Sequence, residues 1–336
     1  MITKSLLGAF GILTVAALAP AASAQAATVS LRTTTCLRRT HAHTQAFLKT
    51  FVNPLNAKKA DVHVNYLGGP EVTPVKEQGN ALKRGLIDII SCPAPYYGGM
   101  FAPARIPGTQ NVSVKEMRKN GGFDMMEKIW NRDLNGHILA WIYSADKFYT
   151  YFRKMPKLSK KTGLDLTDIK MRATGLYNPF LKAMNATTIT MSPSGIYTAL
   201  QRGVVDGFAT TWGSIARRGW QHLIKFRIGP PFFGPSEMTV INLNKWNSLS
   251  KEQQGLLTHQ AQLLENTGSV TLVKDGKEDD KKLKAAGVKF ITLKGAVGKA
   301  YMKTIYGAKW AQTDALNKNT PDYAKLRSLI YHAPAS

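Results

Sequence analysis

The sequence has only two cysteines, Cys36 and Cys92, among its 336 residues. A structural zinc site needs more ligands at closer spacing, so this class of site is excluded. The pair suits one disulfide in an oxidising compartment, and the alternative is two separate thiols. Each cysteine lies near the carboxyl end of a predicted strand. The two strands are expected neighbours in a sheet, so the Cα atoms could approach within the roughly 4.4–6.8 Å that a disulfide needs.

Signatures of nucleotide binding and of nucleophilic catalysis are also missing. The sequence contains no Gly-x-Gly-x-x-Gly loop, no Walker loop and no Gly-x-Ser-x-Gly elbow. His41 and His43 are two residues apart and would face different sides of a helix, so we interpret them as surface or capping histidines. Glu278, Asp279 and Asp280 stand among lysines and are interpreted as a solvated run. We therefore expect no cofactor, no metal site and no catalytic residues, and binding is the favoured function.

Acidic residues are scarce, with 21 Asp and Glu against 45 Lys and Arg, which gives a formal net charge of +24. The basic residues are spread along the chain, and no zinc-finger or RNA-binding signature accompanies them, so nucleic acid is not an expected partner. The charge favours a protein that attracts anionic solutes. The alternative is an alkaline surface with no specific role.

Long apolar runs are confined to the N-terminus, "MITKSLLGAFGILTVAALAPAASAQ". One lysine, a short apolar run and Ala22-Ser23-Ala24 predict a secretory signal over residues 1–24, cleaved after Ala24. The alternative is a membrane anchor, but the run is short for a span of about 20 residues. Cleavage would remove Lys4 and leave a net charge of +23 (24 minus 1). We expect the mature protein to be soluble and periplasmic.

Strand-like and helix-like segments alternate along the rest of the chain. Strands are predicted in "ATVSLRTTTCL", "DVHVNYLGG" and "IDIISCPAP", and helices in "THAHTQAFLKTFVNPLN" and "PEVTPVKEQGNALKRGL" between them. This alternation predicts an α/β protein with parallel strands. The length suits two domains of roughly 150 residues each.

Two segments repeat one pattern. "ALKRGLIDIISCP" (81–93) and "ALQRGVVDGFATT" (199–211) both read Ala-Leu-x-Arg-Gly, two apolar residues and Asp. In each, a helix is expected to end at the glycine and a strand to follow. The repeat predicts two similar lobes that hold a ligand in the cleft between them, at the carboxyl ends of their strands.

The chain is expected to cross between the lobes more than once. "GHILAWIYS" should leave the first lobe, "KFYTYFRKMP" should start the second, and the chain should return after "FRIGPPFFGPSEMTVINL". Ser250 is a plausible N-cap of a long helix that follows. The predicted division assigns 25–146 plus 236–272 to the first lobe and 147–235 plus 273–336 to the second.

Arg172 is the strongest single candidate for a binding residue. It stands in "DIKMRAT", a strand that should end at the cleft and should otherwise be apolar. A guanidinium offers a planar fork that matches a carboxylate in bidentate geometry. The alternative is an internal ion pair with Asp206 or Glu237.

The region "IKMRATGLYNPFLKAMNATTITMSPSGIYTALQRGVVDG" (169–207) resembles the signature region of TRAP transporter solute-binding proteins of the dicarboxylate-binding (DctP) type. The resemblance extends over nearly all of the mature chain. It implies a two-lobed periplasmic solute-binding fold, type II-like, that closes on a carboxylate-bearing solute anchored by the conserved arginine. It also implies delivery of that solute to small and large TRAP membrane subunits. The matching residues are Arg172, Met191, Tyr197, Ala199, Leu200, Gln201, Gly203, Val205, Asp206 and Gly207.

The sequence is therefore identified as an extracytoplasmic receptor for a small organic acid and not as an enzyme. An exported enzyme acting on an organic acid and an ABC-type periplasmic binding protein are the alternatives. The family's usual Gln-Glu-Asn-Pro after Val-Asp-Gly is absent here, so the resemblance does not identify the acid. For the aromatic candidates the alternative is core packing. The candidate ligand-binding residues are Arg172, Trp212, Tyr149, Tyr97, Tyr96, Tyr177, Thr210 and Asn178.

Overall fold

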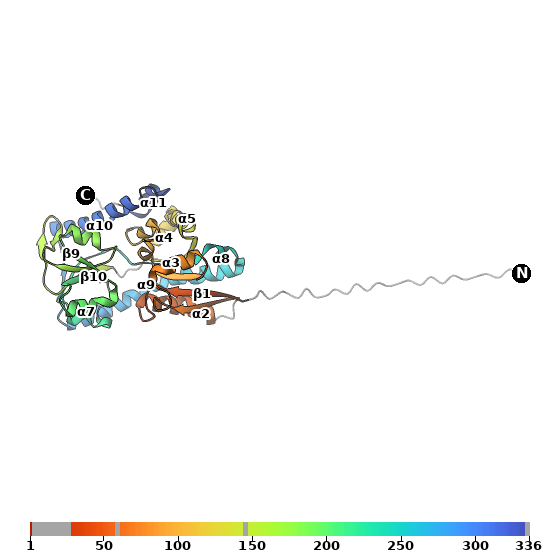
Figure 1. Ribbon diagram of the computed structural model, residues 1–336, viewed down its shortest axis with the longest axis horizontal. Helices are drawn as coiled ribbons and strands as arrows, with labels where there is room; N and C mark the ends of the chain where they lie inside the picture. Colours follow the sequence, from red (N-terminus) through yellow and green to blue (C-terminus); the bar gives the residue numbers. More distant parts are fainter. Residues whose placement is uncertain (2–27, 58–60, 144–146, 333–336) are drawn as a thin grey trace.

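Two mixed β-sheets lie at the centres of two lobes in the computed structural model (Figure 1). The structure describes residues 1, 28–57, 61–143 and 147–332. Apart from Met1, the predicted signal peptide therefore lies outside the described residues. Within the described ranges no helix has the length and apolar character needed to cross a membrane.

The first sheet has five strands. β1 pairs in parallel with β2 and β3, while β12 pairs antiparallel with β3 and β4. β12, which lies between β3 and the edge strand β4, comes from far along the chain, as the predicted return to the first lobe requires. In spatial order the strands are β2 (Val62–Gly68), β1 (Val29–Thr35), β3 (Ile89–Pro93), β12 (Ser236–Asn242) and β4 (Gly136–Tyr143).

The second sheet has six strands. β8 pairs in parallel with β9 and β10, β5 pairs antiparallel with β10 and β11, and β13 pairs in parallel with β11. A separate hairpin joins β6 (Lys157–Ser159) and β7 (Gly163–Asp165). In spatial order the six strands are β13 (Lys289–Thr292), β11 (Phe226–Phe232), β5 (Phe148–Phe152), β10 (Gly207–Thr211), β8 (Lys170–Ala173) and β9 (Thr187–Thr190).

Helices cover both faces of each sheet, so each lobe has two apolar cores. One core of the first lobe joins the sheet to the helices that follow β2 and β3 and to the last helix of the chain, and the other joins it to the helices after β1. The helices of the first core are α3 (Val75–Lys83), α4 (Val114–Asn120), α5 (Gly122–Leu134) and α11 (Tyr323–Ile330). Those of the second are α1 (Ala42–Phe47), the π-helix η1 (Leu48–Val52) and α2 (Asn53–Ala57), with α8 (Leu243–Asn247) following β12.

The second lobe repeats this arrangement with one core under α6 (Asn178–Ala183) and α10 (Gly295–Asn317), and another under α7 (Ile196–Gln201). Short 3-10 turns complete the loops of both lobes. They are η2 (Ala94–Tyr97), η3 (Ala102–Arg105), η4 (Pro193–Gly195), η5 (Ala216–Arg218) and η6 (Trp220–His222).

Two helices connect the lobes. α9 (Lys251–Ala285) begins at Ser250, whose capping box with Gln253 confirms the predicted N-cap. Its first half packs on β4 and α1 of the first lobe, and its last turns reach η5 of the second. α10 runs from the second sheet towards η3, and α11 then packs on α5 and α4 (Figure 1). The last helix thus lies on the first lobe, which the expected range of 273–336 for the second lobe does not anticipate.

The repeated sequence pattern corresponds to a repeated structure. After α3 and after α7 the chain turns at Gly85 (φ +71°) and Gly203 (φ +69°), where a left-handed backbone favours glycine. Asp88 then accepts a hydrogen bond from the backbone N–H of Arg32 on the neighbouring strand, at 2.8 Å. Asp206 accepts the equivalent bond from Lys170, at 3.0 Å. The two βαβαβ units, β1 to β3 and β8 to β10, are therefore built on one plan, as the sequence predicted.

Candidate ligand-binding site

Arg172 lies on β8 with its side chain buried, at 2 % relative exposure. Its Nε donates to the carbonyl of Met191, just beyond β9, at 3.0 Å. Among the described residues Nη2 has no hydrogen-bond partner and the guanidinium makes no ion pair. A buried guanidinium that keeps its charge and lacks a counter-ion is costly, so this geometry suits a partner that comes from outside the chain.

The two carboxylates considered as internal partners of Arg172 are engaged elsewhere. Asp206 accepts from the backbone of Lys170, within the repeated turn described above. Glu237, on β12 of the first lobe, accepts from the hydroxyl of Ser91 at 3.3 Å and lies 4.0 Å from Nδ1 of His43. The described contacts thus include neither of the internal ion pairs that the sequence left open.

Two tyrosines accompany Arg172, one from each lobe. Tyr177 is the N-cap residue of α6 and is buried, whereas Tyr96 lies in η2 of the first lobe and is partly buried. Burial raises the pKa of both phenols, and the positive charge of Arg172 offsets part of that rise. Burial also lowers the pKa of Arg172, and the two tyrosines counteract this. These mutual effects place the three ionisable groups within electrostatic range of one another across the two lobes.

Arg218 is a further residue of this site, and it was not among the residues predicted from the sequence. It ends η5, in the loop after β10, and its guanidinium lies 4.8 Å from the ring centroid of Trp220. Burial lowers the pKa of Arg218, the charges of Arg217 and Arg172 lower it further, and Tyr96 and Asp279 oppose them. The signal in the sequence is the Arg-Arg-Gly-Trp run (217–220) in the loop that follows the strand neighbouring Arg172. We call Tyr96, Arg172, Tyr177 and Arg218, with His41 of the first lobe, the inter-lobe site.

His41 contributes a neutral ring to the inter-lobe site. It is the N-cap residue of α1, and its Nδ1 accepts from the backbone N–H of His43 at 3.2 Å. Burial lowers its pKa well below the ordinary value, and His43, Arg218 and Arg217 lower it further. The expectation of a surface or capping histidine is confirmed for His41 and is wrong for His43, which is buried within α1 at 5 % exposure beside Glu237.

Trp212 and Tyr149, two of the expected aromatic walls, belong to a network anchored on α9. The indole N–H of Trp212 donates to Asp280 at 2.6 Å, and Arg227 also donates to that carboxylate. The Arg227 guanidinium lies 4.3 Å from the ring centroid of Tyr149. Both aromatic side chains therefore have internal partners, and their contact with a ligand stays a prediction.

The interpretation of residues 278–280 as a solvated run is wrong for two of the three. Asp279 is 5 % exposed and accepts from the backbone N–H groups of Ile215 and Ala216, at 3.2 and 2.7 Å. Asp280 holds Trp212, as described above, and only Glu278 is exposed, paired with a nearby lysine. The reason is tertiary, because these two carboxylates accept from backbone N–H groups and an indole of a loop more than 60 residues away, and Asp280 also meets Arg227 on β11.

The remaining candidates have structural partners in the described part of the chain. Tyr97 is 3 % exposed and packs edge-to-face on Trp130, with ring centroids 5.9 Å apart, inside the first-lobe core. Asn178 accepts from the hydroxyl of Thr188 at 2.7 Å and ties α6 to β9. Thr210 is partly buried on β10, which pairs with β5. Their roles in ligand binding stay predictions.

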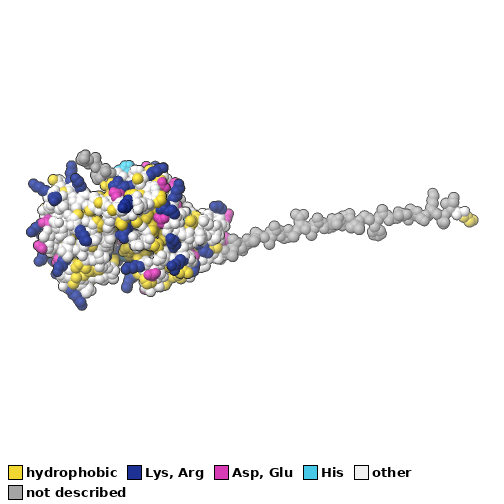
Figure 2. All heavy atoms as spheres, turned by 45° about the horizontal axis from the view of Figure 1, so that its top comes forward, with side chains coloured by type: hydrophobic (Ala, Val, Ile, Leu, Met, Phe, Trp, Pro, Cys, Tyr) yellow, Lys and Arg dark blue, Asp and Glu magenta, His cyan; other side chains and the backbone are white. Residues whose placement is uncertain are grey.

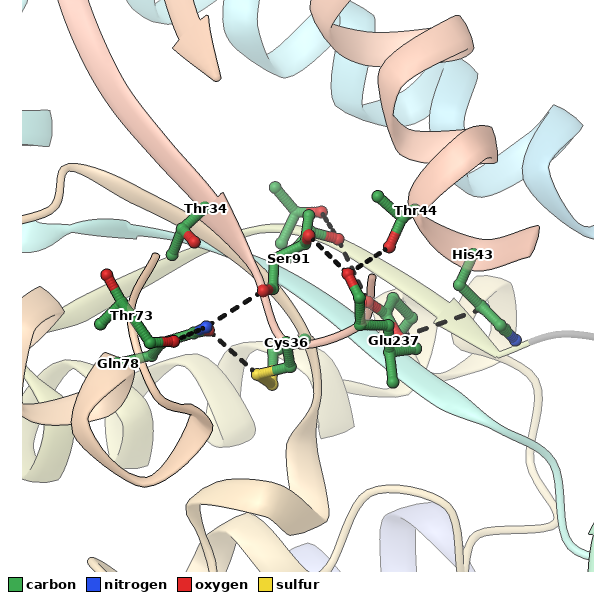
Figure 3. The surroundings of a disulfide bond; sticks show 12 residues. Thr34, Cys36, His43, Thr44, Thr73, Gln78, Ser91 and Glu237 are labelled. Carbon is green, nitrogen blue, oxygen red and sulfur yellow. Dashed lines mark hydrogen bonds and ion pairs between the residues drawn. A yellow bond between two sulfur atoms is a disulfide. The ribbon is translucent and has the colours of Figure 1, made fainter. Parts of the chain in front are cut away.

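The predicted disulfide between Cys36 and Cys92 is present, with a Cα–Cα distance of 5.0 Å. It joins the carboxyl ends of β1 and β3, which are neighbours in the sheet. Figure 3 shows the amide of Gln78 pointing at Cys36, and this buried amide donates to the carbonyls of Thr35 and Thr73 at 3.0 and 2.8 Å. The disulfide and the amide together fix the segment that leads into His41.

Three further observations bound the chemistry of the molecule. The described ranges hold no group of three or more His, Cys, Asp or Glu side chains that could bind a metal ion. Two hollows on the surface are lined by first-lobe residues such as Asn111 and Leu86, and neither includes a residue of the inter-lobe site. Lys and Arg side chains are scattered over the face seen in Figure 2 and do not gather in one patch.

Comparison with known proteins identifies a family and a set of structural relatives. A sequence model of the family described as bacterial extracellular solute-binding protein, family 7, matches residues 114–312. The TRAP periplasmic solute-binding protein of Desulfovibrio salexigens with bound orotic acid superposes with a TM-score of 0.74 at 16% identity, covering 89% of this chain and 96% of that one.

Two other solved structures are similarly close. The extracytoplasmic solute receptor of Bordetella pertussis that binds pyroglutamic acid has a TM-score of 0.73 at 15% identity, covering 90% of this chain and 99% of that one. The TRAP periplasmic solute-binding protein of Pseudomonas putida F1 with bound D-glucuronate has a TM-score of 0.67 at 23% identity, covering 86% and 97%. The expected two-lobed α/β solute-binding fold is confirmed.

Proposed function

This chain belongs to family 7 of the bacterial extracellular solute-binding proteins, and we propose on that basis that it is the receptor of a TRAP-type transporter. It binds a small organic acid in the periplasm and delivers it to the small and large membrane subunits. The structural relatives named above hold orotic acid, pyroglutamic acid and D-glucuronate, and each of these carries a carboxyl group.

The observation that carries this proposal is the unsatisfied guanidinium of Arg172. Its Nε is held by a backbone carbonyl, while Nη2 has no partner among the described residues. A carboxylate placed against the free edge would form charge-assisted hydrogen bonds at short range. Burial at 2 % exposure strengthens such a pair, because the effective dielectric is lower there than in water.

Tyr96 and Tyr177 complete the proposed site. They come from opposite lobes, so a solute held at Arg172 and touched by both phenols binds the closed arrangement better than an open one. Differential affinity of this kind shifts the population towards closure. Aromatic rings also bury the apolar part of a small acid while their hydroxyl groups remain available for hydrogen bonds.

The chemistry of the site favours binding without turnover. The inter-lobe site brings together two arginines, two tyrosines held in the phenol form and a neutral histidine. Within the described residues no carboxylate of either lobe is placed beside Arg172 to serve as its acid–base partner. We therefore propose that the protein is a receptor and not an exported enzyme. The coupling to TRAP and not to ABC membrane subunits follows from the family.

Binding of organic acids to Arg172 variants tests the proposal. A thermal-shift screen of organic acids with the mature protein should identify a stabilising acid, whose affinity is then measured by titration calorimetry. Arg172→Lys keeps the charge but loses the planar fork, so it should bind that acid much more weakly. Arg172→Ala should lose on the order of 2–5 kcal/mol of binding free energy.

Arg202→Ala is the matched control, because Arg202 is exposed on the same lobe and should leave affinity unchanged. The apo Arg172 variants should melt near the parent, since the partner of the guanidinium comes from outside. Parent-like binding by both Arg172 variants would contradict the proposal, as would an apo Arg172→Ala protein that melts far below the parent.

A further inference from the structure

We propose that Arg218 is a second ligand-contacting cation of the inter-lobe site, and that it selects solutes carrying a second acidic oxygen group besides the carboxylate at Arg172. This inference rests on the proposed function and extends it to the opposite end of the solute. Three features of the structure support it: the placement of the η5 loop, the different fates of two adjacent arginines, and the uncharged wall that faces them.

The first feature is that the fold brings Arg218 to the same edge of the second sheet as Arg172. β8 and β10 are parallel neighbours, and Phe208 stands opposite Arg172 in their register. Their carboxyl ends therefore meet at one edge, and the loop after β10 starts beside the loop after β8. Arg218 follows seven residues after β10 ends at Thr211 (218 minus 211).

The loop that carries Arg218 is held by α9 and is not free to swing away. Asp279 accepts hydrogen bonds from the backbone N–H groups of the loop at Ile215 and Ala216, and Asp280 accepts one from the Trp212 indole at the start of the loop. A left-handed turn at Gly219 (φ +71°) closes it. A side chain on such a loop is positioned in advance, so little conformational freedom is lost when it meets a ligand.

The second feature is the contrast between Arg217 and Arg218. Arg217 donates to the carbonyl of Gly213 at 2.9 Å and pairs with Asp275 at 3.5 Å, so its charge is compensated within the loop. The side chain of Arg218 makes no hydrogen bond or ion pair with another described residue, and its guanidinium lies against the face of Trp220. A partly buried guanidinium stacked on an indole keeps its five N–H donors directed along its edge, where an oxyanion can reach them.

The third feature is the uncharged wall that the first lobe presents to Arg218. Among the described residues, the carboxylate that acts on Arg218 is that of Asp279 on α9, which is already occupied by the backbone N–H groups of Ile215 and Ala216. Two first-lobe residues interact electrostatically with the Arg218 guanidinium, Tyr96 and His41, and both are uncharged at neutral pH. Glu237 also acts on Tyr96, but it is bonded to Ser91 and lies beside His43 (Figure 3). The site thus has two positive charges, Arg172 and Arg218, that repel each other. A solute with two acidic groups neutralises both, whereas a monoacid leaves one unpaired.

A solute series with one or two charges tests the inference. Succinate, glutarate and adipate are compared with their monomethyl esters, which keep the length and lose one charge. 3-Phosphonopropanoate asks whether the second group can be a phosphonate. Affinities are measured by titration calorimetry for the parent, Arg218→Gln and Arg217→Gln. The Arg217 variant is the matched control, because it removes the same charge from the neighbouring position.

The parent should bind at least one of the diacids about 10-fold or more tightly than its half-ester. Arg218→Gln should bind the diacid about 10-fold or more weakly and bind the half-ester with nearly the parent's affinity, so its preference for the diacid should disappear. Arg217→Gln should keep the preference for the diacid. Three results would overturn the inference: discrimination that survives in Arg218→Gln, equal loss in both variants, and a parent that binds none of the probes with two acidic groups.

The proposed function has a separate point of failure. Arg172→Lys should weaken the diacid and the half-ester together, because both place a carboxylate on Arg172. If Arg172→Lys binds every probe as the parent does, the carboxylate anchor is wrong whatever Arg218 does. If it weakens both probes while Arg218→Gln changes neither, the proposed function stands and the role of Arg218 falls.

Discussion

Replacing Lys309 by methionine should stabilise this protein at neutral pH. Lys309 lies on α10 at 1 % exposure, and its Nζ donates to the side chain of Gln312 at 3.1 Å. Within the described structure it has no carboxylate partner. Burial, together with the nearby charge of Arg105, lowers the pKa of the amine from 10.5 to about 8. The folded protein thus retains a buried positive charge at pH 7 that the unfolded chain would expose to water.

The magnitude follows from that shift. A change of about 2.5 pKa units corresponds to about 3 kcal/mol, since each unit is worth about 1.36 kcal/mol. Between pH 8 and pH 10.5 the unfolded chain binds the proton that the folded protein has lost, so the free energy of unfolding rises with pH in this window. Below pH 8 both states are protonated and the full cost applies. The advantage of Lys309→Met should therefore be about 3 kcal/mol at pH 7 and about 1.5 kcal/mol at pH 9.5.

Urea unfolding of parent and variant at the two pH values measures this difference directly. Methionine matches the length of the lysine stem and fills irregular apolar space well, so the replacement should leave little cavity. Lys303→Met is the matched control, because Lys303 is exposed on the same helix and should change stability by no more than about 0.5 kcal/mol. A Lys309 variant no more stable than the parent at pH 7 would refute the reasoning, as would a difference that does not shrink at pH 9.5.

Three other predictions concern the disulfide, a close backbone contact and the lobes. The double variant Cys36→Ser, Cys92→Ser should have a free energy of unfolding about 2–4 kcal/mol lower than the parent in urea, because the disulfide links residues 56 positions apart in the sequence. An unchanged urea midpoint would argue against a stabilising role of the disulfide. Gly163→Ala should lower the free energy of unfolding by well over 2 kcal/mol, since a Cβ there (φ +84°) would lie 2.4 Å from the Tyr301 Cα. The control Gly287→Ala, at φ +80° with open space around it, should lower it by only about 1–2 kcal/mol. Similar denaturation midpoints for the two variants would show that the contact with Tyr301 is unimportant. Saturation with a bound acid should reduce the radius of gyration in small-angle scattering, and no compaction would count against closure of the lobes.

Local patterns were enough to predict most of the framework. The repeated glycine turns before Asp88 and Asp206 and the Ser250 cap depend on residues within a few positions, so a single sequence reveals them. The disulfide followed from only two cysteines at the ends of neighbouring strands.

The side-chain partners of the site were harder to predict, because they come from distant segments. Asp279 and Asp280 look solvated among lysines, yet they bind a loop that begins at Trp212. The same distance concealed Arg218, whose position depends on that loop. Arg172 was found because a charged residue in a buried strand contradicts its local pattern, and a conflict of this kind is visible without a structure.

The insertion of β12 between β3 and β4 has a consequence for how the chain assembles. β12 begins 93 residues after β4 ends (236 minus 143), and the whole of β5 to β11 lies between them. A chain that emerges amino end first presents β1 to β4 while β12, which joins β3 to β4 in the sheet, is still missing. The first sheet then consists of separate pieces with unpaired edges until residue 242 has emerged, and the second sheet waits in the same way for β13. Neither lobe can therefore fold as an independent early unit, and the protein completes both sheets only after most of its length has been exported.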